Sequence, residues 1–131
     1  MKRTSILLLH AFVGWAICGA IIGIGFSLTT EYNTLIIHAC AVPVVFGVIA
    51  WNYFRRFHYT SPFITACIFL MFIAGTDFFL VALLIQKSLV MFSSLIGTWI
   101  PFLSIFLTTY IAGIFTKKIS TYTIANEQSD R

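Results

Sequence analysis

The fold is decided by the stretch Phe63-Ile-Thr-Ala-Cys-Ile-Phe-Leu-Met-Phe-Ile-Ala-Gly-Thr-Asp-Phe-Phe-Leu-Val-Ala-Leu-Leu-Ile85. A helix of about 20 apolar residues crosses the hydrocarbon core of a bilayer, so this run predicts a membrane span. It contains Asp77, the only acidic residue of the chain that lies within an apolar run. An ionised carboxyl group inside hydrocarbon costs several kcal/mol. The partner of Asp77 and its purpose are therefore the central question about function.

The composition of the whole chain is that of a membrane protein. Of the 131 residues, 60% are hydrophobic and only 9% are charged, and the mean hydropathy is +0.98. A soluble domain carries roughly 25% charged residues. Four apolar runs, at about 6–28, 34–54, 63–85 and 89–115, predict an all-α, polytopic four-helix bundle. It forms one domain over 1–118, and the remaining residues, 119–131, read as a polar, disordered cytoplasmic tail.

The positive charges predict how the bundle is oriented. Basic residues concentrate in the loops of one side, namely Lys2, Arg3, Arg55, Arg56, Lys117 and Lys118. The loops of the other side carry only Glu31 and Lys87. Because Lys and Arg accumulate in cytoplasmic loops, both termini are predicted to lie in the cytoplasm, in a multi-pass protein of the inner membrane. The net charge of +4 is thus explained by topology and the lipid bilayer, and nucleic-acid binding has no support.

Several polar residues of three spans are predicted to share a level. At a rise of roughly 1.5 Å per residue, Asp77 lies about 9–12 Å from the outer edge and His38 roughly 6 Å from it. Ser94 and Thr98 of the fourth span fall near this level. Pro43 and Pro101 fall a little deeper, and each is expected to kink its helix. We expect an outward-opening polar recess in which Asp77 and His38 meet and bind a substrate or proton, together with Ser94 and Thr98.

Small residues mark the surfaces where helices are expected to approach closely. Gly19 and Gly23 form a GxxxG pair in the first span, and Gly97 is their counterpart in the fourth. Such glycines allow close backbone contact between membrane helices. The Gly19/Gly23 face serves either packing within the chain or contact with a second copy, and a homo-oligomer is expected.

The spacing of metal-ligating and redox residues weakens several cofactor chemistries. His10 and His38 lie near opposite membrane surfaces, which does not suit a haem held by two histidines. The three cysteines, Cys18, Cys40 and Cys67, form no CxxC pair and read as packing residues. The zinc-peptidase motif H-E-x-x-H is absent from the sequence. We therefore expect neither a metal nor a cofactor.

Three hypotheses about the function remain open. The preferred one is binding or passage of a small solute or ion, with Asp77 as a protonatable site. The second is a non-catalytic membrane module that stabilises or regulates a partner membrane protein, in which Asp77 only holds the bundle together. The third is an intramembrane enzyme that acts on a lipid-soluble substrate, with His38 and Asp77 as acid and base.

Overall fold

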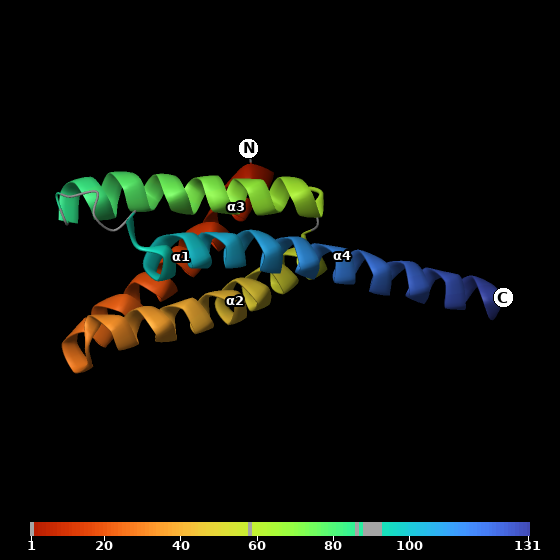
Figure 1. Cartoon of the computed structure of the whole chain (residues 1–131). Helices are drawn as coiled ribbons and strands as arrows, with labels where there is room; N and C mark the ends of the chain where they lie inside the picture. Colours follow the sequence, from red (N-terminus) through yellow and green to blue (C-terminus); the bar gives the residue numbers. More distant parts are fainter. Residues whose placement is uncertain (1, 58, 86, 88–92) are drawn as a thin grey trace.

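The computed structural model describes residues 2–57, 59–85, 87 and 93–131, and Figure 1 shows their arrangement. This part of the chain is helical and has no strand. Its elements are α1 (Lys2–Leu28), α2 (Glu31–Arg56), α3 (Pro62–Thr76), η1 (Asp77–Ile85), η3 (Leu95–Trp99) and α4 (Ile100–Ser129). α3 continues into η1, and η3 continues into α4, so the elements form four long helices. These four are long and apolar enough to cross a membrane, so the chain is a multi-pass membrane protein.

Hydroxyl side chains fix where the helices begin. The Thr30 side chain accepts a hydrogen bond from the backbone N–H of Asn33 at the start of α2. Ser61 does the same for Ile64 at the start of α3, where Pro62 occupies the first turn. Each cap satisfies a backbone donor that the helix itself leaves unpaired, and proline at this position loses no helical hydrogen bond.

The four helices pack in a ring in the order α1, α2, α4, α3. Each helix packs against its two neighbours in this order, while α1 and α4, like α2 and α3, lie on diagonals. Large rings fill the centre, where Phe46 of α2 lies 6.2 Å from Phe69 of α3 between ring centroids.

The end of the bundle where α2 leads into α3 is closely packed. The His10 ring of α1 lies 5.6 Å from the rings of both Tyr53 and Phe57. The Tyr53 hydroxyl shares a hydrogen bond with Thr60, which in turn bonds Thr65 of α3. Aromatic contacts and the hydrogen bonds between these hydroxyl groups thus join α1, the end of α2 and the start of α3.

The third span departs from regular α-helix in its C-terminal half, and the fourth span does so at its N-terminal end. At Asp77 the third span widens from α3 into the π-helix η1, where the sequence predicted a uniform α-helix over 63–85. In the fourth span the π-helix η3 precedes α4, and Pro101 lies in the first turn of α4. Because Pro101 has no N–H, the carbonyl of Gly97 cannot receive the usual α-helical bond. Pro43, by contrast, lies inside α2, which continues on both sides of it.

The C-terminal residues form a helix, and the disorder predicted for 119–131 is wrong. α4 extends to Ser129, with exposed side chains over its last three turns. Thr121 and Thr123 donate hydrogen bonds to the carbonyls of Lys117 and Ile119, and Lys118 lies over the ring of Tyr122. These local contacts allow the helix of the fourth span to continue. The predicted start of that span at residue 89 lies outside the described residues.

Candidate functional site

Asp77 occupies the point at which the third span changes its helical geometry. Its backbone N–H is shared between the carbonyls of Ile73 and Ala74, and its side chain is half-buried in the bundle. The preceding residue, Thr76, donates to the carbonyl of Phe72 and so satisfies its own hydroxyl. π-Helical turns within α-helices occur frequently at functional sites, because they redirect side chains.

The partner of Asp77 is Trp15. The indole Nε1–H of Trp15 on α1 donates a hydrogen bond of 2.8 Å to Oδ1 of Asp77. This bond links two neighbouring helices of the ring. Sequence reasoning missed Trp15, although an indole is a donor only and the middle of span one lies at a depth that a residue in the middle of span three can reach.

No basic side chain accompanies this carboxyl group. All eight Lys and Arg residues and all four Asp and Glu residues belong to the described part of the chain, and no ion pair joins any of them there. The Trp15 indole is neutral, so the hydrogen bond brings no opposite charge to Asp77. The described chain offers Asp77 one neutral donor and no cation.

His38 does not pair with Asp77, and the contact expected between them is wrong. His38 lies on α2 with only 7% of its surface exposed, and its Nδ1 has no hydrogen-bond partner in the described chain. In the described chain α2 and α3 meet only through large side chains in the centre of the bundle, such as the rings of Phe46 and Phe69, and the hydrogen bond of Asp77 goes to α1 instead. Depth alone therefore placed the two side chains at one level but not in contact.

Ser94 and Thr98 belong to η3 and its cap. The Ser94 hydroxyl accepts a 3.0 Å hydrogen bond from the backbone N–H of Gly97 and so serves its own helix. Thr98 is buried at 1% exposure. No hydrogen bond joins Ser94, His38 and Asp77 among the described residues.

The glycines expected to pack behave differently from one another. A Cβ atom added to Gly19 or Gly23 would meet nothing within 4 Å among the described residues. At Gly14 an added Cβ would lie 2.6 Å from the Phe46 ring, at Gly25 it would meet the side chain of Thr34, and at Gly97 it would lie 2.9 Å from the Ser94 hydroxyl. α1 therefore approaches α2 closely at Gly14 and Gly25, not at the GxxxG pair.

Two hollows among the described residues lie away from Asp77. One, of ≈ 740 Å³, lies between α1 and α2 near His10 and Arg56. Another, of ≈ 410 Å³, lies beside the start of the polar part of α4 near Lys117. Neither is lined by Asp77 or His38, so the outward recess expected around these residues finds no support in them.

Comparison of the chain with protein-family models, with curated proteins and with solved structures gave no match.

Proposed function

We propose that this membrane protein binds or passes a small solute or ion, with the Asp77 carboxyl group gaining and losing a proton as part of that function. The observation that carries the proposal is the Trp15–Asp77 hydrogen bond between α1 and α3, formed without a basic partner. An acid inside a membrane span is expensive to ionise and is by default a candidate for a functional site.

The neutral indole explains why a change in protonation would matter. With a proton on Asp77 the bond from Trp15 is an ordinary neutral hydrogen bond, whereas with an ionised carboxylate it becomes charge-assisted and about twice as strong. Loss of the proton therefore draws Trp15 toward Asp77 while it raises the cost of keeping the group out of water. These opposing effects couple a proton to the contact between α1 and α3.

Trp15 itself supplies a direct test. In a variant that carries Trp51→Phe and Trp99→Phe, Trp15 is the single tryptophan, because the chain has three. Its fluorescence in lipid nanodiscs, followed over pH, should show a transition that Asp77→Asn abolishes. A transition that persists in the Asp77→Asn variant would assign it to another group, and a flat profile in both would reject proton exchange at Asp77.

Passage is tested separately in liposomes. Liposomes that contain the protein and a trapped pH dye should acidify faster than empty ones when a potassium gradient and valinomycin impose an inside-negative potential. The increment should be lost in Asp77→Asn at equal amounts of folded protein. If protein-containing and empty vesicles acidify at the same rate, proton passage is rejected, and the fluorescence titration then decides whether Asp77 only binds.

We propose that the protein lies in the inner membrane of the cell. The end of the bundle that carries most of the basic residues then faces the cytoplasm. The support for this orientation is the gathering of six basic residues where α1 begins, α2 ends and the apolar part of α4 ends. Reporter fusions at both termini should be cytoplasmic, and one in the Thr29–Asn33 turn should be external. A cytoplasmic signal from that turn would reject this arrangement.

A second candidate function, a module that associates with other membrane proteins or with its own copies, is favoured by the open glycine face of α1. Gly23→Leu should leave thermal stability unchanged in mild detergent, because an added Cβ atom would meet nothing within 4 Å among the described residues, yet it should reduce the mass of any oligomer. Gly14→Leu is the matched control and should destabilise the fold itself, since the added side chain meets Phe46. A monomeric wild type would remove this face from consideration as a self-association surface.

A further inference from the structure

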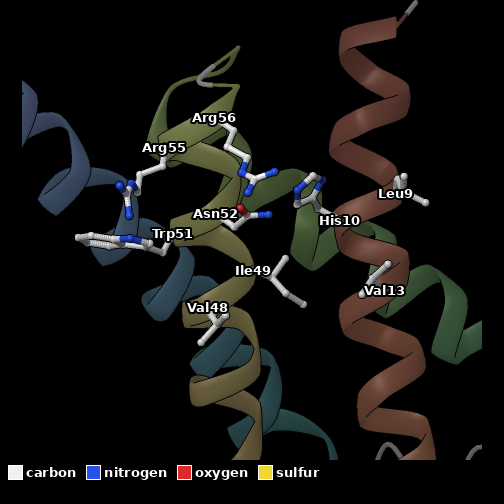
Figure 2. Close-up of a pocket in the computed structure, with 9 residues that line it drawn as sticks. All are labelled: Leu9, His10, Val13, Val48, Ile49, Trp51, Asn52, Arg55 and Arg56. Carbon is white, nitrogen blue, oxygen red and sulfur yellow. The ribbon is translucent and has the colours of Figure 1, made fainter.

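A groove runs along the bundle surface between α1 and α2, with a volume of ≈ 740 Å³. Figure 2 shows its two walls, with His10 and Val13 on α1 and Asn52 and Arg56 on α2. We refer to it as the α1–α2 groove. It shares no residue with the Trp15–Asp77 contact, so its role is independent of the function proposed above.

One end of the α1–α2 groove is polar. Arg56 and Asn52 lie on the side of α2 that faces His10, whereas Arg55 lies on the far side of α2 (Figure 2). The Arg56 guanidinium has no carboxylate within ion-pair distance in the described chain, and Asn52 makes no side-chain hydrogen bond there. His10 donates from Nδ1 to the carbonyl of Ile6 at 2.8 Å, which leaves its Nε2 for a ligand.

The rest of the groove is apolar and faces outward. Val13 of α1 and Val48 of α2 are 43% and 65% exposed, and with Leu9 and Ile49 they line the wall that continues from the polar end. Arg56 and Val48 are two turns apart on α2, about 12 Å along the helix. A ligand that fills the groove therefore needs a polar head and an apolar body of at least that length.

The charge around the polar end is uniformly positive. Arg3 lies close by over the ring of Tyr59, and Arg55 lines the groove as well as the neighbouring hollow beside Lys117. The four acidic residues lie elsewhere, at Glu31, Asp77, Glu127 and Asp130. Basic residues grouped at the end of a membrane helix attract anionic lipid headgroups.

We propose that the α1–α2 groove binds an anionic phospholipid of the surrounding leaflet. Its phosphate lies against Arg56, with the Asn52 amide as a hydrogen-bond donor beside it, and one acyl chain lies along Val13 and Val48. The order of these groups along the groove, with a cation at the helix ends and apolar side chains toward the middle of the bundle, matches the order of the parts of a phospholipid. A soluble anion would use only the polar end.

The test counts bound lipid by native mass spectrometry on the full chain in mild detergent, titrated with phosphatidylglycerol or phosphatidylcholine. Phosphatidylglycerol should bind more tightly. Arg56→Gln should weaken it about fivefold, as expected for one basic residue near an anionic surface. Lys118→Gln removes the same charge from α4 outside the groove, and it should have a smaller effect.

The apolar wall and the source of the phosphate are tested in the same assay. Val13→Trp should fill the groove and lower phosphatidylglycerol binding, whereas Val44→Trp, at an exposed site of α2 outside it, should not. Glycerol 3-phosphate should fail to displace the lipid. The proposal would be overturned if the two lipids bound equally or if Arg56→Gln and Lys118→Gln had equal effects. It would also be overturned if Val13→Trp left binding unchanged or if glycerol 3-phosphate displaced the lipid.

Discussion

Asp77 and His38 are both ionisable residues inside membrane spans, yet the bundle treats them differently. The Asp77 carboxyl group receives a 2.8 Å hydrogen bond from Trp15 of a neighbouring helix. His38 is more deeply buried, and its Nδ1 is without a partner in the described chain. One residue therefore takes part in holding two helices together, while the other is held in place by the packing around it.

The difference lies in the partners that the two side chains meet. Trp15 of α1 reaches Asp77 on the neighbouring third span, whereas the α2 side chains that reach α3, such as Phe46, meet its rings in the centre of the bundle. A membrane buries most of each helix regardless of its rotation, so depth and polarity in a sequence say little about which polar groups face each other. Loss of the Asp77 side chain should therefore affect the bundle more than loss of the His38 side chain.

The largest effect is expected for Asp77→Leu. This change removes the acceptor and leaves the Trp15 N–H without a partner inside the bundle, which should cost about 1–2 kcal/mol of unfolding free energy. Thermal or denaturant unfolding in mild detergent measures it. Asp77→Asn is the control, because its amide oxygen still accepts from Trp15, and it should lose much less. Equal losses in the two variants would show that the hydrogen bond does not stabilise the fold.

A smaller effect is expected for Trp15→Phe. Phenylalanine keeps most of the ring packing and removes only the donor, and a protonated Asp77 can turn its proton to a carbonyl one turn back in its own helix. The loss should be about 1 kcal/mol in the same unfolding assay. Trp99→Phe, at a site that is 54% exposed, is the matched control and should change less. The reverse order of these two variants would argue against a bond at Trp15.

The smallest effect is expected for His38→Leu. Leucine is close in size and has no polar atoms to satisfy, so replacing a ring whose Nδ1 lacks a partner should change the unfolding free energy by no more than about 0.5 kcal/mol, or should raise it. His38→Gln keeps a polar side chain and should be the less stable of the two. A loss of more than about 2 kcal/mol in His38→Leu would mean that His38 makes a stabilising polar contact.

The sequence predicted the general architecture well. Composition and the four apolar runs predicted an all-α membrane protein with four long helices, and the third run was predicted to begin at Phe63, one residue after α3 begins. It did not predict the widening at Asp77, because a π-helix follows from backbone contacts over many residues. The helix beyond Lys118 was missed because polar residues were equated with disorder, although threonine back-bonding and the Lys118–Tyr122 contact support it locally.

The candidate site was harder to predict for a related reason. Asp77 stands out in the sequence by its charge, but Trp15 is one of three tryptophans and nothing in its neighbourhood identifies it as a donor. The GxxxG pair stands out by its spacing, yet Gly14 and Gly25, which belong to no such motif, are the α1 glycines that lie close to α2. Both errors concern rotation about a helix axis, which a single sequence leaves open.

A pair of double-mutant cycles in mild detergent tests most directly the central claim that Asp77 is paired with Trp15 and not with His38. One cycle combines Asp77→Leu with Trp15→Phe, and the other combines Asp77→Leu with His38→Leu, all scored by unfolding free energy. We expect a coupling of about 0.5–1.5 kcal/mol in the first cycle and additivity within about 0.5 kcal/mol in the second. Additivity in the first cycle together with coupling in the second would contradict the account.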